Sequence, residues 1–282
     1  IHLIGPVHGT KVTESGTSFA APIVAGRAAE LLGRVERLSP LVARALLVHT
    51  ANHPDGVPDR ELGYGVVPGS VEEILNCSPT KATVIYQSTL RPASFAKLPV
   101  VLPEVQGFTG TVTIDWTNAL MSPVDHLNVD EYTELAMEDT FYPHSDVHLV
   151  VSADGRQKRR LATTSDEGKR LMAAGWRPSQ LPISNSGNIY RRESELRADF
   201  KWDTVVRRRI SKRYASLQKP SIILHGLSRN GQDRNARLSY AVIISVSAPK
   251  FPGNLYREVL RQYKLLEPLR LKSINEIRVS IA

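Results

Sequence analysis

The chain has 282 residues, of which 41% are hydrophobic and 23% are charged, and its formal net charge is +8. This length suits one large domain or two ordinary ones, and the composition is that of a globular protein. No apolar run reaches the length of about 18 residues that a membrane-spanning helix needs. The single cysteine, Cys77, excludes an intrachain disulfide. It favours a reducing, cytoplasmic compartment without fixing the localisation.

The charge is unevenly distributed along the chain. Residues 1–80 contain six Lys and Arg against eight Asp and Glu, whereas residues 81–282 contain thirty against twenty. The change of sign coincides with the turn-forming sequence Asn76-Cys77-Ser78-Pro79. We therefore predict two domains, 1–78 and 79–282.

The segment from Glu14 to Gly26 reads ESGTSFAAPIVAG and carries the strongest local signal. A small turn precedes Ser18, and a helix of small residues follows at once, so Ser18 is expected at or just inside the first helical turn. Free N–H groups and the positive end of the helix dipole favour negative charge there. A serine nucleophile beside an oxyanion donor would gain from this position. The alternative is an ordinary capped helix with an Ala/Gly packing face.

This run, G-T-S-F-A-A-P-I-V-A-G, resembles the nucleophile motif of the subtilisin-like serine proteases. The following pattern is also similar to theirs: two helices, a Pro/Asp/Gly-rich loop, a short G-x-G strand and a short helix. The predicted segments are 18–35, 41–48 after Ser39-Pro40, 52–60, 63–68 and 71–75. The resemblance covers residues 1–77 and implies an α/β segment, the C-terminal part of a doubly wound parallel-sheet domain.

The resemblance implies that Ser18 is the catalytic nucleophile and that its own backbone N–H donates to the oxyanion. Gly16 and Thr17 would shape the turn that presents it. The family orders its triad Asp, His, Ser, with an oxyanion Asn between His and Ser, so we expect these groups before Ile1. The chain would then be a C-terminal fragment, inactive alone, with a polypeptide substrate and the upstream half of the protease as partners. His8-Gly9-Thr10 imitates the family's histidine motif but lies too close to Ser18, so we interpret His8 as a loop residue.

Beyond Lys81 the pattern becomes mostly strand-like. Alternation predicts strands separated by turns, which favours an antiparallel β-sandwich of jelly-roll or immunoglobulin-like type, and two capped helices interrupt it. The predicted strands are 82–87, 94–102, 110–116, 147–152, 204–214, 221–226 and 237–246. The segment 130–139 is ambiguous and favours strand, and the predicted helices are 165–174 and 254–266.

Other functions were weighed against these patterns. Basic clusters at 156–160, 207–213 and 229–237 suggest nucleic acid, but strand alternation separates Arg208 from Arg207 and Arg209, and aromatic interleaving is lacking. We therefore favour solvated faces over nucleic acid. The alternative function is a binding or scaffolding module for a protein partner or, less favoured, for nucleic acid through the basic β domain. His144, Asp146 and His148 would share one strand face that could hold a metal, but a polar solvent face is the simpler interpretation. No cofactor is identified, and calcium follows from the family resemblance only.

Overall fold

The computed structural model describes residues 2–4, 9–13, 16–56, 58–59, 61–184, 201–229 and 236–272. The chain divides into two compact units. The first contains the described residues up to Asn76 together with those from Glu267 onward, and the second runs from Cys77 to Leu266. The predicted assignment of functional domains to 1–78 and 79–282 stays a prediction.

Three helices form most of the first unit, and their starts follow local sequence. Ser39 accepts a hydrogen bond from the N–H of Val42, and Ser70 accepts one from the N–H of Glu73, so each serine caps a helix. The elements are α1 (Thr17–Arg34), α2 (Pro40–Thr50) and α3 (Val71–Leu75), with the antiparallel strands β1 (His2–Ile4) and β2 (Lys11–Thr13). The parallel sheet implied by the family resemblance is not seen in the described part of this unit. The predicted strand 63–68 contributes only isolated bridges there, between Asn52 and Val66 and between Asp59 and Gly63.

The C-terminal residues return to the end of α1. The N–H of Glu36 donates to the carbonyl of Arg270 (2.9 Å), and the N–H of Lys272 donates to the carbonyl of Arg34 (2.8 Å). The Lys272 ammonium also donates to the carbonyl of Leu32 (2.9 Å). The last carbonyls of a helix lack intrahelical partners, and a cation there favours the dipole. The end of α1 is therefore stabilised by residues that follow the whole second unit in sequence.

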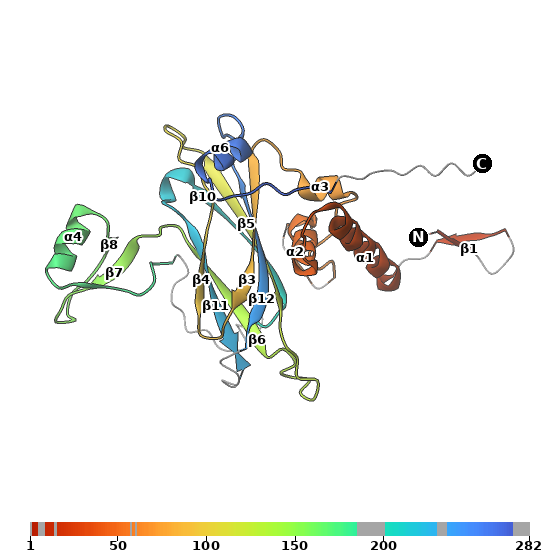
Figure 1. The fold of residues 1–282 in the computed structure, drawn as a ribbon, viewed down its shortest axis with the longest axis horizontal. Helices are drawn as coiled ribbons and strands as arrows, with labels where there is room; N and C mark the ends of the chain where they lie inside the picture. The colour runs from red at the N-terminus through yellow and green to blue at the C-terminus, as the bar shows by residue number, and fades with distance from the viewer. Residues whose placement is uncertain are drawn as a thin grey trace. The chain divides into compact units, whose positions relative to one another are not determined.

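The second unit is mostly antiparallel β-structure, as the sequence predicts (Figure 1). Its four-stranded sheet has the order β10-β5-β12-β3, and a three-stranded sheet has the order β4-β11-β6. All pairings in both sheets are antiparallel. The strands are β3 (Lys81–Leu90), β4 (Phe95–Pro99), β5 (Thr111–Met121), β6 (Leu135–Tyr142), β10 (Val205–Arg213), β11 (Ser221–Ser228) and β12 (Leu238–Ser247).

Alternate residues of the two sheets form one shared apolar core. Ile114 and Trp116 of β5 lie in it with Ile222 of β11 and Phe141 of β6. The rings of Trp116 and Phe141 are stacked with their centroids 6.0 Å apart. Because strand side chains alternate between faces, the period-2 pattern in the sequence gives each sheet one apolar face to bury against the other.

A small sheet with one helix is inserted between β6 and β10. Its strands are β7 (Val147–Val151), β8 (Lys158–Ala162) and β9 (Arg177–Pro178), in the order β8-β7-β9, and α4 (Asp166–Ala173) follows β8. The sequence did not predict β8, because its residues KRRLA show no apolar alternation. Pairing with β7 creates this strand.

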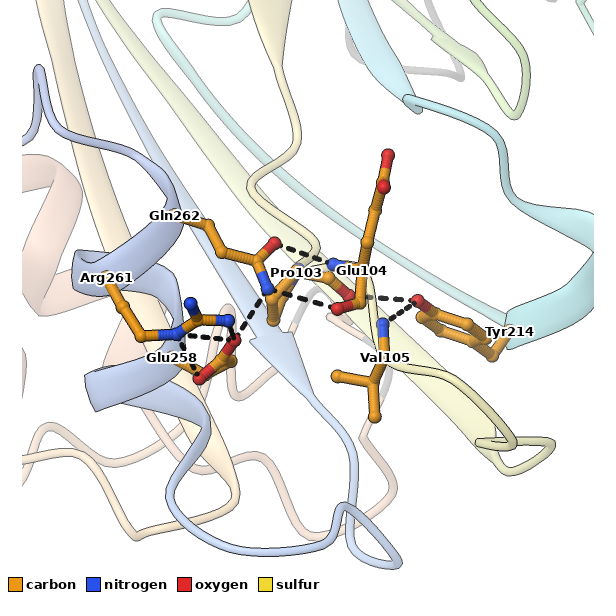
Figure 2. A network of polar contacts seen from close by, with 7 residues as sticks. All are labelled: Pro103, Glu104, Val105, Tyr214, Glu258, Arg261 and Gln262. Carbon is orange, nitrogen blue, oxygen red and sulfur yellow. Dashed lines mark hydrogen bonds and ion pairs between the residues drawn. The ribbon is translucent and has the colours of Figure 1, made fainter.

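Helix α6 (Leu255–Gln262) is fastened to the loop that follows β4 (Figure 2). The side-chain amide of Gln262 accepts a hydrogen bond from the N–H of Glu104 (2.8 Å) and donates one to its carbonyl (3.0 Å). Nearby, the Tyr214 hydroxyl donates to the carbonyl of Pro103 and accepts from the N–H of Val105, both at 2.9 Å. The two side chains pair main-chain groups that no strand reaches.

We expect Gln262→Ala to destabilise the docking of α6 by about 1–2 kcal/mol, because both main-chain groups of Glu104 lose their partner. Hydrogen exchange of the α6 amides and the urea midpoint of the second unit measure the effect. Arg257→Ala, an exposed change on the same helix, is the matched control. Equal behaviour of the two variants would contradict this role of Gln262.

Candidate active site

Ser18 is the second residue of α1 and its side chain is exposed. Gly16 is the N-cap residue of this helix. Its carbonyl accepts hydrogen bonds from the N–H groups of Phe19 (3.0 Å) and Ala20 (3.1 Å). The N–H groups of Thr17 and Ser18 precede these bonds, so they belong to the set that a helix cannot satisfy internally. The hydroxyl of Ser18 thus lies at the positive end of the helix dipole, where a developing anion is stabilised.

Pro22 alters the main chain of this first turn. It lies inside α1, four residues after Ser18. Proline lacks the N–H that would otherwise donate to the carbonyl of the residue four positions earlier. The carbonyl of Ser18 therefore lacks the regular helical partner, whereas the carbonyl of Gly16 accepts from two N–H groups of this turn.

Gly16 leaves space beside this turn. Its φ of 166° is extended backbone that any residue adopts. A Cβ built on it would meet only Cδ2 of Phe19, at an ordinary contact distance of 3.8 Å. Neither backbone strain nor packing against described residues requires glycine at this position. The place where a side chain would stand next to Ser18 is open.

The half of α1 that follows Ser18 is uncovered. Ile23 is 60% exposed and Val24 37% exposed, whereas Leu31 and Val35 at the other end are fully buried. The small residues of this half, which we expected to pack against a sheet, are also exposed: Ala20, Ala21, Ala25 and Gly26. The described residues of this unit supply no sheet for that face, which explains the difference.

A tight loop after α2 holds a buried histidine. The N–H of Asp55 donates to Nδ1 of His53 (3.1 Å), so the neutral ring carries its proton on Nε2, which lies 3.2 Å from Oδ2 of Asp59. The other carboxylate oxygen of Asp59 accepts from the N–H groups of Leu62 (2.6 Å) and Glu61 (2.8 Å). The Leu62 hydrogen bond is the largest cause of the lowered pKa of Asp59, and His53 contributes further.

His53, Asp55 and Asp59 are also close enough to suggest a metal site. Both ring nitrogens of His53 already have partners, however, and Asp59 closes the loop by two main-chain bonds. The cluster therefore has a structural role that needs no ion.

Several arginines of the predicted basic clusters have contacts within the second unit. Asp139, whose side chain is 2% exposed, accepts hydrogen bonds from Trp116 and Arg208, and Arg209 pairs with Asp115. Arg208 and Arg209 thus lie on opposite faces of β10, as the alternation predicts. The Arg229 guanidinium stands 3.9 Å from the ring centroid of Trp202. These arginines make contacts within the fold, whereas residues 156–160 are exposed.

His144, Asp146 and His148, for which a metal was weighed against a polar solvent face, do not form a ligand set among the described residues. Asp146 accepts a hydrogen bond from Thr164 (2.6 Å), and Nδ1 of His148 lies 2.9 Å from the carbonyl of Ser179. His8 and Arg234 lie outside the described residues. Among the described residues, no helix is both long and apolar enough to cross a membrane.

Comparison with protein families gives one match. Residues 4–65 match the subtilase family, peptidase S8, which is less than a quarter of the chain. The matched segment contains α1 and α2 with Ser18 at the start of α1. The match supports a relationship of this segment to the subtilase family of serine peptidases. No curated protein matches the chain.

Comparison with solved structures gives weak likenesses to a viral protein. The VP2 subviral particle of infectious bursal disease virus is 12% identical with a TM-score of 0.28, covering 62% of this chain and 34% of that one. The structure of the Gt strain of this virus is 10% identical with a TM-score of 0.27, covering 71% of this chain and 38% of that one. The structure of the Gx strain is 12% identical with a TM-score of 0.22, covering 71% of this chain and 40% of that one. The chain thus spans well under half the length of these proteins, and likenesses of this size establish neither its fold nor its function.

Gly65→Ala should destabilise the loop 52–66, because a Cβ there would lie 2.3 Å from the carbonyl oxygen of Asn52 and φ is +95°. Gly63→Ala is the matched control: its φ is +57°, but nothing lies within 4 Å of the added atom. The control should cost about 1 kcal/mol of backbone strain and Gly65→Ala clearly more. Hydrogen exchange of the Asn52 and Val66 amides, which pair across the loop, reports the difference. Equal protection in both variants would refute the steric reason.

The loop should also open in acid. Hydrogen bonds from Leu62 and Glu61 hold the pKa of Asp59 below the ordinary value of 3.8. A lowered folded-state pKa gives stability that is complete above 3.8 and is lost as the pH falls through the folded-state pKa. Exchange of the Gly63 amide, measured from pH 5 downward and corrected for intrinsic rates, should show this loss. Asp59→Asn keeps an acceptor oxygen but cannot titrate, so the pH dependence should disappear, and its persistence would assign it to another group.

Proposed function

We propose that this chain is the C-terminal part of a subtilisin-like serine endopeptidase and that Ser18 is its nucleophile. The observation that carries the proposal is the family match over residues 4–65, which falls on the segment where Ser18 stands exposed at the amino end of α1. In this reaction Oγ of Ser18 bonds to the carbonyl carbon of a peptide, and a base takes its proton. The amine then leaves with a proton, and water releases the acyl group.

The oxyanion formed in this step would lie near the N–H of Ser18 itself. That amide is at the start of α1, where helix N–H groups are unsatisfied and the dipole favours negative charge. The open space at Gly16 gives a substrate main chain room to approach, and Thr17 continues the turn. These features support the roles that the resemblance implies for Gly16, Thr17 and Ser18.

His49 and His53 are unsuited to act as the base. His49 is 2% exposed, and both ring nitrogens of His53 are occupied by Asp59 and the Asp55 amide. We therefore assign the base, its orienting Asp and the Asn donor to protease sequence outside the described residues, as the family resemblance implies. The uncovered half of α1, with Ile23 and Val24 exposed, is the surface on which that sequence would pack. The sandwich, of jelly-roll or immunoglobulin-like type, would be an accessory domain, and a polypeptide would be the substrate.

A serine-directed fluorophosphonate probe tests this function on the full-length gene product. We expect label at Ser18, lost in Ser18→Ala and kept in Ser78→Ala, an exposed serine outside the site. The 282-residue chain alone should label far more slowly, because the hydroxyl lacks a base. Absence of label from a folded full-length protein would refute the protease assignment and favour a scaffold.

A further inference from the structure

The connection between β5 and β6 presents apolar side chains to solvent. Residues 121–134, which we call the acidic loop, lie at the end of β5 away from α6. Leu127 is 85% exposed and Val129 is 88% exposed. Met121, Val124 and Tyr132 are also exposed. Single exposed apolar residues are normal, but five within one short connection indicate a contact surface.

The acidic loop is held in one conformation by its own hydrogen bonds. The N–H of Asp125 donates to the carbonyl of Tyr132 (2.9 Å), and the carboxylate of Asp125 accepts from the N–H of Leu127 (2.9 Å). The side chain of Asn128 accepts from the N–H of Glu131 (3.2 Å). A preformed loop loses little conformational freedom on binding, so its exposed apolar tip is suited to docking.

The charge of this loop is entirely negative. It contains Asp125, Asp130, Glu131 and Glu134 and no Lys or Arg. Glu131 contacts Arg229 at 3.6 Å. Asp130 and Glu134 are exposed and have no ion-pair partner in the described part of the chain. A partner for this surface should therefore combine apolar contacts with positive charge.

The small inserted sheet offers a surface of that kind. Helix α4 lies against one face of this sheet, so the two faces differ. On that face Arg159 pairs with Glu167 of α4 (3.1 Å) and stands 5.8 Å from the ring centroid of Trp176. Val150 of the same face is fully buried. Residues opposite each other across strands share a face, so the strand register gives the composition of the other one. This basic face carries Val147, Leu149, Val151, Lys158, Arg160 and Arg177.

The cations of the basic face are available for a partner. Lys158, Arg160 and Arg177 are exposed, and no ion pair within the described residues engages them. Leu149, which lies opposite Arg160, is 37% exposed. The basic face is thus a mixed surface of aliphatic and cationic side chains, the converse of the acidic loop.

We propose that the acidic loop of one copy of this chain docks on the basic face of a second copy. Both surfaces remain exposed within a single copy, so neither is occupied by the other there. Nucleic acid fits the basic face less well, because aliphatic residues lie between the cations. Trp176 lies under Arg159 on the other face and is not interleaved with these cations. Two different surfaces meet in each contact, so repetition gives a filament or a closed assembly, of which a reciprocal dimer is the smallest.

Sedimentation of the full chain across a wide concentration range tests the proposal. We expect association of the wild type that weakens with added salt. Reversal of the loop, Asp130→Arg with Glu134→Arg, or of the face, Lys158→Glu with Arg160→Glu, should weaken it by about tenfold or more. Lys169→Glu with Arg170→Glu on α4 is the matched control and should associate like the wild type.

Mixing the two reversed variants provides the decisive measurement. Each alone should remain monomeric, but together they should pair, because the reversed loop of one suits the reversed face of the other. Pairing also shows that both variants are folded. A wild type that stays monomeric, or reversed variants that associate like the control, would overturn the proposal. So would a monomeric wild type whose Lys158 and Arg160 bind a single-stranded oligonucleotide, which would assign the face to nucleic acid instead.

Discussion

Burial of one apolar face by each of two antiparallel sheets is the interaction on which the second unit depends. Strand β12 pairs with β3 on one side and β5 on the other along its whole length, and its Val242, Ile244 and Val246 point into the shared core. The loop after β4 and α6 close the core through side chains that bond main-chain groups (Figure 2). Because the two sheets bury each other's apolar faces, loops and an inserted sheet can vary at the margins of this core without disturbing the strands.

The first unit differs in that its most distinctive helix is only half buried. The end of α1 near Leu31 and Val35 is packed and capped by returning C-terminal residues, while the end with Ser18 and Ile23 is open. The match to the subtilase family falls on the segment that contains this open end. There the hydroxyl of Ser18 lies at the amino end of a helix, where negative charge is favoured, and Ile23 presents an apolar side chain to solvent.

Charge in the second unit separates into structural and available groups. Arg208 and Arg209 have carboxylate partners and Arg229 lies over Trp202, so these three cations of the basic stretches are engaged within the sandwich. On the inserted sheet Lys158, Arg160 and Arg177 are exposed and have no ion pair among the described residues, and the same holds for Asp130 and Glu134 of the acidic loop. This separation distinguishes surfaces that can bind from charges that only stabilise, and net charge alone does not show it.

The sequence by itself determined the elements that depend on neighbours in the chain. These are the start of α1 before Ser18, the serine cap at Ser39, the Asn254 cap of α6 and the alternation that defines the long strands. Only the tertiary structure decided which distant groups meet. It created β8 by pairing, closed the His53–Asp59 loop, required glycine at position 65 and left half of α1 uncovered. The physical reason is range: caps and alternation act over a few residues, whereas pairing partners, close approaches and exposed faces depend on segments that the fold brings together.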